Sequence, residues 1–128
     1  MRIAVIVARV LLGLLFFVFG LNGFLHFMPN PPPTPAAGAF FGALIATRYM
    51  FFLIFGTQVL GGALLLIGVA VPFALVLLAP VIVNILFFHI FLSPDLLPMA
   101  LLVAALELFL AWYYRAAFAP LFGGAVRT

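Results

Sequence analysis

The sequence predicts an all-α membrane protein built as a four-helix transmembrane bundle. Of its 128 residues, 70% are hydrophobic and only 5% are charged, whereas a soluble domain carries about 25% charged residues. Four separate apolar segments approach or exceed the roughly 20 residues that a helix needs to cross the hydrocarbon core. We therefore expect a single transmembrane domain over residues 1–128, with the lipid bilayer as its surroundings.

The first helix is predicted over about residues 3–25. Its apolar run is long and lacks an A-x-A-like cleavage site, which favours a transmembrane helix over a secretory signal. Gly13, Gly20 and Gly23 fall close to Arg9 in helical projection. Small residues on one face let another helix approach closely, so this stripe predicts a tight helix contact.

Residues 26–48 are predicted to form a proline-rich outer loop and a short helix. Five prolines lie between residues 29 and 35, and such a segment is stiff and cannot continue a helix. Thr34 is a good N-cap and Pro35 a good first residue for a helix that follows. About a dozen residues are too few to span a bilayer, so we expect a re-entrant or interfacial helix at the outer mouth of the bundle.

The other three spanning helices are predicted over about residues 50–67, 72–91 and 96–115. Gly68 is a typical C-terminal signal and Pro72 a typical restart, so the first two of these form an antiparallel hairpin. Ser93, Pro94 and Asp95 mark the next turn. The final helix closes on the run WYYR, an aromatic and basic end typical of a membrane interface.

The charges predict the orientation of the bundle. With four crossings both termini lie on one side, which collects Arg2, Arg9, Arg115 and Arg127, while the opposite side holds Arg48 and Asp95. The positive-inside rule then places both termini in the cytoplasm. Scattered arginines form no basic patch, so no nucleic-acid partner is expected. The absence of cysteine from the sequence excludes thiol and iron–sulfur chemistry by this chain alone.

Two charged residues and one amide fall inside the predicted spans. At about 1.5 Å per residue, Arg9 lies about 10 Å, Glu107 about 12 Å and Gln58 about 15 Å from the cytoplasmic helix ends, which predicts an intramembrane polar cluster. One interpretation is a structural ion pair between Arg9 and Glu107 that fixes the first helix against the last. The other is a proton or quinone site, because intramembrane charges are costly and often functional.

A second polar layer is predicted toward the outer side, from Asn22, His26, Asn84 and His89. Two histidines on different helices suit a b-type haem or the carbonyl of a quinone. The simpler interpretation is that each histidine binds a backbone carbonyl or faces interfacial water. Two histidines fall short of the three protein ligands that zinc normally takes, so no metal is predicted.

Three stretches together resemble the DoxX family of small bacterial four-helix membrane proteins. They are ARVLLGLLFFVFGLNGFLHF, FGTQVLGGALLLIGVAVPFALVLLAPVIVNILFFHIFLSP and LELFLAWYYR. The resemblance covers nearly the whole chain. It implies a protein of the bacterial cytoplasmic membrane, in a family sometimes linked to redox work such as quinone-coupled thiosulfate oxidation.

These observations favour a non-catalytic accessory subunit of a larger membrane complex, most plausibly a respiratory or redox one. The alternative is a quinone-linked redox protein, similar to a thiosulfate:quinone oxidoreductase subunit, with a quinone at the cluster around Glu107 or a quinone or haem at the histidine layer. A small transporter or pore is a third hypothesis, weakened by the scarcity of polar residues to line a path. The sequence contains no catalytic motif, so no catalytic residue is predicted.

Overall fold

The chain is all helical in the parts that its computed structural model describes, residues 1–26 and 34–123. The helices are α1 (Arg2–Leu25), α2 (Pro35–Ala46), α3 (Met50–Ile67), α4 (Val71–Phe91), the 3-10 turn η1 (Pro94–Leu96), α5 (Leu97–Tyr113) and α6 (Arg115–Phe122). Four segments are long and apolar enough to cross a membrane: α1, α3, α4 and the continuous stretch Pro94–Tyr113. The predicted all-α bundle of four apolar helices is therefore confirmed. The predicted proline-rich loop falls mainly on residues 27–33, which lie outside the described residues.

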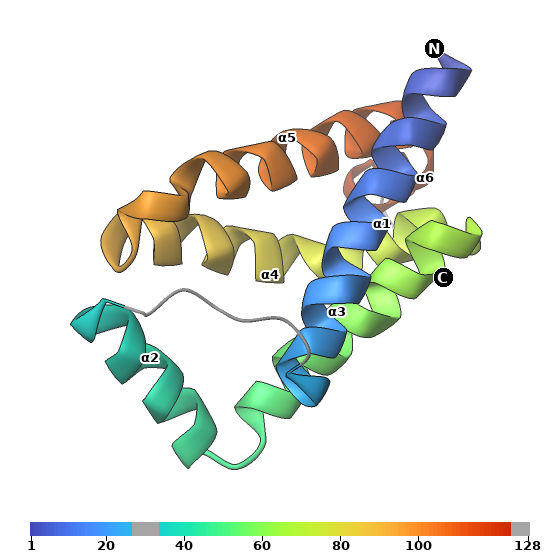
Figure 1. Cartoon of the computed structure of the whole chain (residues 1–128). Coiled ribbons are helices and arrows are strands. Elements are labelled where there is room, and N and C mark those ends of the chain that lie inside the picture. Colours follow the sequence, from blue (N-terminus) through green and yellow to red (C-terminus); the bar gives the residue numbers. More distant parts are fainter. Residues whose placement is uncertain (27–33, 124–128) are drawn as a thin grey trace.

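The spanning helices form two antiparallel pairs (Figure 1). One pair is α1 with α3, and the other is α4 with α5. The pairs meet where α1 begins and α5 ends, and they diverge toward the opposite end. There α2 runs from the turn between α4 and α5 to the start of α3. The short helix thus connects the two pairs at the end where they diverge.

Two sets of contacts hold α2 in this place. The Thr34 hydroxyl donates a hydrogen bond to the Leu92 carbonyl oxygen at 2.6 Å and accepts one from the Ala37 amide at 3.2 Å. The same side chain therefore caps α2 and ties its start to the end of α4. Further along, the rings of Phe40 and Phe41 lie 5.4 and 5.2 Å from the ring of Phe88, between centroids.

The closest helix contact in the bundle is between α1 and α3, and it depends on glycine. A Cβ atom at Gly13 would lie 2.9 Å from the Gly62 carbonyl oxygen, and one at Gly62 would lie 2.5 Å from the Phe17 backbone nitrogen. A Cβ atom at Gly20 would likewise lie 3.0 Å from the Val59 backbone nitrogen. The two backbones therefore touch, as the glycine stripe on the first helix predicts.

The end of the last spanning helix differs from the sequence prediction. A helix through residue 115 was expected, but α5 ends at Tyr113 and the separate helix α6 begins at Arg115. The Arg115 guanidinium donates to the Trp112 carbonyl oxygen at 2.9 Å and lies 4.8 Å from the centre of the Trp112 ring. This side chain takes a carbonyl that a continuing helix would bond, and Tyr114 forms the break between α5 and α6.

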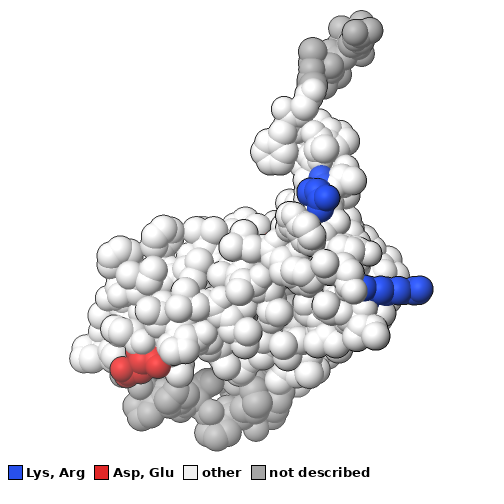
Figure 2. Space-filling model, turned by 90° about the horizontal axis from the view of Figure 1, so that it is seen from above, with Lys and Arg blue, Asp and Glu red and all other residues white. Residues whose placement is uncertain are grey.

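The outer surface is apolar along the spans. Large side chains such as Phe73, Leu101 and Leu108 are more than half exposed. Figure 2 shows basic side chains toward one end of the molecule, an acidic one at the other, and neither kind between them. Such a surface suits lipid, and the fold is that of a multi-pass membrane protein.

Candidate functional site

Arg9 contacts backbone carbonyls. Its Nη1 atom donates to the Leu65 carbonyl oxygen at 2.6 Å and to the Leu66 carbonyl oxygen at 3.4 Å. These carbonyls belong to the last turn of α3, whose C-cap is Gly68 with φ 76°. A cation there satisfies acceptors that the helix leaves open and complements its dipole. Arg9 is therefore a cap supplied by α1 to α3.

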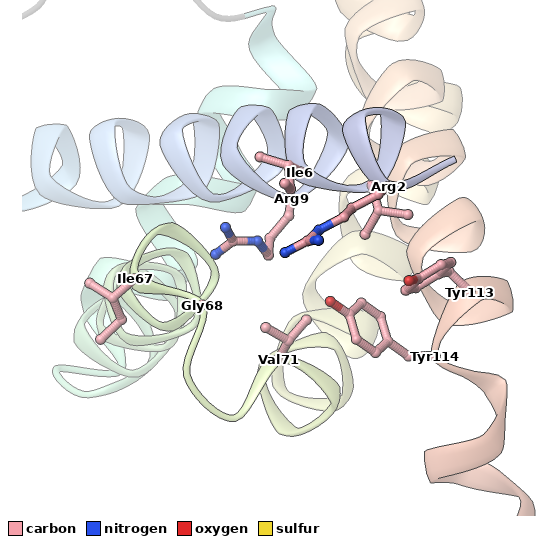
Figure 3. A pocket seen from close by; sticks show the side chains of 9 residues that line it. Arg2, Ile6, Arg9, Ile67, Gly68, Val71, Tyr113 and Tyr114 are labelled. Atoms are coloured by element: carbon pink, nitrogen blue, oxygen red, sulfur yellow. The ribbon is translucent and has the colours of Figure 1, made fainter.

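A cavity of about 360 Å³ lies beside this cap, at the end where the two helix pairs meet (Figure 3). Arg2 and Arg9 line it from α1, Gly68 from the end of α3, and Tyr113 and Tyr114 from the end of α5. The guanidinium groups of both arginines and the Tyr114 hydroxyl group point into the cavity. The lining contains no carboxylate, so the two positive charges have no acidic partner there.

Glu107 lies on the face of α5 that packs into the bundle. It is 8% exposed and follows the buried Ala100 and Val103 at helical spacing. Its Oε1 atom is fully buried and makes no hydrogen bond within residues 1–26 and 34–123. In the same ranges the structure records no ion pair between Glu107 and Arg9.

Gln58, the third member of the predicted cluster, lies at the α1–α3 contact. It is 7% exposed, and a Cβ atom at Gly20 would lie 3.1 Å from its own Cβ. Among the described residues no hydrogen bond connects it to Arg9 or Glu107. The three residues are therefore each buried or partly buried, but no bond among the described residues joins them into one cluster.

The predicted outer layer is distributed over two separate helix ends. Asn22 is buried in α1, and His26 is the exposed C-cap of α1 with φ 52°. His89 lies in the last turn of α4, where its Nδ1 atom is 2.8 Å from the Ile85 carbonyl oxygen. In Figure 1 the C-terminal ends of α1 and α4 lie in different parts of the molecule. The structure thus assigns His89 a backbone contact and does not bring the two histidines together.

Asn84 lies in a different environment from the rest of this layer. It is an exposed residue of α4 and lines a cavity of about 300 Å³ between α2, α3 and α4. Apolar side chains make up the rest of the lining: Phe40, Leu44, Met50, Ile54, Pro80 and Val81. In the described part of the chain the Asn84 carboxamide makes no hydrogen bond. Pro80 lies one turn earlier and leaves the Val76 carbonyl without its usual intrahelical donor.

Sequence reasoning missed Arg2, Tyr113 and Tyr114 as parts of a site. It used Arg2 for the orientation of the bundle and counted Tyr113 and Tyr114 in the interfacial run WYYR. The way the helix ends meet places all three around one cavity. The available signal was that four crossings predict WYYR and the start of the chain on the same side of the membrane. No protein-family model, curated protein or solved structure matches this chain.

Proposed function

We propose that this chain is a non-catalytic accessory subunit that packs against a larger complex of the bacterial cytoplasmic membrane. The resemblance to the DoxX family makes a respiratory or redox complex the preferred partner. Most of the described chain consists of membrane-spanning helices and short connections. Two of its polar side chains serve the bundle itself, because Arg9 caps α3 and Thr34 attaches α2 to the end of α4.

The single observation that carries the proposal is the exposed Asn84 carboxamide. It lies on a spanning helix, about 10 Å from the outer end of α4 at 1.5 Å per residue. An amide without a partner is costly in hydrocarbon, and a polar side chain from a neighbouring helix commonly satisfies it. The occupant that we propose is a transmembrane helix of a partner subunit, which donates to or accepts from Asn84.

The cavity beside Asn84 supports the same occupant. Its volume of about 300 Å³ and its apolar lining would accept one large side chain of the partner helix. Contacts between membrane helices combine interhelical hydrogen bonds with close packing, and this site offers both to a partner helix.

The orientation belongs to the same proposal. Arg2, Arg9 and Arg115 are all carried by the helix ends that meet at the tyrosine-lined cavity, and Arg48 precedes α3 at the other end. The positive-inside rule supports a cytoplasmic position for both termini. In this orientation Asn84 lies in the outer leaflet of the membrane.

The experiment compares two neighbouring substitutions on the exposed part of α4. Asn84→Leu removes the amide, whereas Val83→Leu changes a neighbouring exposed residue that is already apolar. Each variant is tagged, purified gently from native membranes and analysed by quantitative mass spectrometry. We expect at least about a fivefold loss of the partner from Asn84→Leu, since one hydrogen bond contributes about 1 kcal/mol. Val83→Leu should retain the partner. Equal recovery of the partner with both variants would contradict the role of Asn84.

A quinone-linked redox function is the second candidate, favoured by the aromatic residues beside the same cavity. Phe40 lines it, and its ring lies 5.9 Å from Phe41 and 5.4 Å from Phe88. A quinone ring would pack on such rings while the Asn84 amide donates to its carbonyl oxygen. Solvent extraction of the purified protein tests this function. A stoichiometric quinone, lost in Asn84→Leu, would favour it over the accessory role.

A further inference from the structure

The cavity between Arg2, Arg9, Tyr113 and Tyr114 has the composition of an anion site. Two guanidinium groups point into one space of about 360 Å³, and no carboxylate lines it. The described residues contain no ion pair to either arginine. Glu107 is absent from the lining, and the exposed Asp95 precedes α5 at the opposite end of that helix. Like charges that share a cavity repel each other, and a bound anion would remove this repulsion.

The donors that remain available suit a phosphate group. The hydrogen bonds of Arg9 to α3 use Nη1, and within the described ranges its Nε and Nη2 atoms make none. Arg2 makes no hydrogen bond to these ranges either. A guanidinium carries five N–H donors in a planar fork that matches two phosphate oxygens, and a tyrosine hydroxyl can donate to a third. The Tyr114 hydroxyl group points into the same cavity.

The position of the cavity indicates where the phosphate comes from. It lies at the ends of spanning helices, which is the depth of lipid head groups, and tyrosine and arginine are the residues that favour this depth. Ile6 and Ile67 also line the cavity, and they are 43% and 69% exposed. Exposed apolar side chains next to a cationic cavity would contact the acyl chains of the same molecule.

We propose that this cavity binds the phosphate of an anionic phospholipid head group. Arg2 and the free donors of Arg9 hold the phosphate oxygens, and the Tyr114 hydroxyl donates a further hydrogen bond. The bound lipid connects α1 to the end of α5, two elements that otherwise meet mainly through apolar side chains. This site is independent of the partner contact at Asn84, which lies toward the other end of the bundle.

Native mass spectrometry of the full chain in detergent tests the proposal. The protein is titrated with phosphatidylglycerol and with phosphatidylcholine of the same acyl chains, and the fractions with one bound lipid are compared. We expect a preference for phosphatidylglycerol of at least about tenfold, because both lipids carry the phosphate but the choline group of phosphatidylcholine would add a third cation beside the two guanidinium groups. Arg2→Gln should bring the two lipids to near equality. Tyr114→Phe should weaken the binding of phosphatidylglycerol about fivefold by removing one neutral donor to the phosphate.

Arg115→Gln is the matched control. It removes the same charge near the same end of α5, but Arg115 donates to Trp112 and does not line the cavity. We expect this variant to keep the wild-type preference. Arg2 is the better test position than Arg9, because Arg9 also caps α3 and its loss would disturb the fold.

Three results would overturn the proposal. The first is equal binding of the two lipids by the wild-type protein. The second is an equal loss of preference in Arg2→Gln and Arg115→Gln, which would assign the effect to net charge. The third is an affinity for inorganic phosphate equal to the affinity for phosphatidylglycerol, which would show that the acyl chains contribute nothing and would make free phosphate the ligand.

Discussion

Arg9 shows how one side chain stabilises this bundle through backbone carbonyls. Its Cα lies about 10 Å from the start of α1, counted at 1.5 Å per residue. Counted along the helices, Arg9 and Glu107 lie at similar depths, and for this reason the sequence predicted a contact between them. The long side chain instead reaches the last turn of α3, where Leu65 and Leu66 present open carbonyls. Counting residues locates a Cα atom, and it does not locate the end of a flexible side chain.

A double-mutant cycle separates this cap from an ion pair. Arg9→Leu should lower the free energy of unfolding by about 1–3 kcal/mol, because two carbonyls lose a charged donor. Glu107→Leu should be neutral or stabilising, since it removes a buried oxygen that has no partner among the described residues. The two effects should add to within about 0.5 kcal/mol. The measurement is reversible unfolding in detergent micelles. A coupling energy well above 1 kcal/mol would show that Arg9 and Glu107 interact directly.

At the scale of elements, the contact between α1 and α3 is set by glycines that leave no space for a side chain. Gly62 faces backbone atoms of Phe17, and Gly13 faces the Gly62 carbonyl oxygen. The stripe on the first helix was visible in the sequence, because small residues recur on one helical face. The helix that packs against this stripe was not visible in the sequence, because the sequence does not show which helix lies beside the first one. The structure provides that partner in α3, the next spanning helix along the chain.

Two glycines of α3 test this contact directly. Gly62→Ala should destabilise the bundle by about 1–3 kcal/mol, because a Cβ atom would lie 2.5 Å from a backbone nitrogen that cannot move away alone. Gly56→Ala is the matched control on the same helix, where a Cβ atom would meet nothing within 4 Å. Since alanine favours helix over glycine, this control should be neutral or slightly stabilising. Thermal unfolding of both variants in one detergent is sufficient. Equal loss of stability in the two would argue against a close α1–α3 contact.

Helix ends were predictable where a local signal marks them. Gly68 ends α3 in the left-handed conformation that glycine favours, and Thr34 caps α2 as its sequence context predicts. The break at Tyr114 was missed, because nothing in WYYR is a strong helix breaker. At this break the Arg115 side chain donates to the Trp112 carbonyl oxygen. The packing of Phe40 and Phe41 on Phe88 is likewise a tertiary contact between distant segments.

At the scale of the whole molecule, two helix pairs meet at one end and diverge at the other (Figure 1). Composition predicts a membrane protein, because so apolar a chain requires lipid around it, and four separate apolar segments predict the four spanning helices. The two cavities were not predictable, since each combines residues from three helices or more. Sequence reasoning did select Arg9 and Asn84, one residue of each cavity, because polar groups in a span are costly and need a partner.

The two cavities suggest a division of roles along the membrane normal. The arginine-lined cavity at the end where the pairs meet suits an anionic lipid, and the apolar cavity beside Asn84 suits a partner helix. In an accessory subunit with this arrangement, the bound lipid would fix the depth of one end in the membrane. The other end would bind the partner helix. Neither role requires a catalytic residue in this chain.

The most direct test of the accessory role is gentle purification of the tagged wild-type chain from its native membrane. The same fraction is analysed by quantitative mass spectrometry and by absorption spectroscopy. The account predicts a larger membrane protein in stoichiometric amount, and no quinone or haem that stays with this chain when the partner is removed. A chain that purifies alone and carries a stoichiometric quinone or a haem band would contradict the accessory role and favour the redox function.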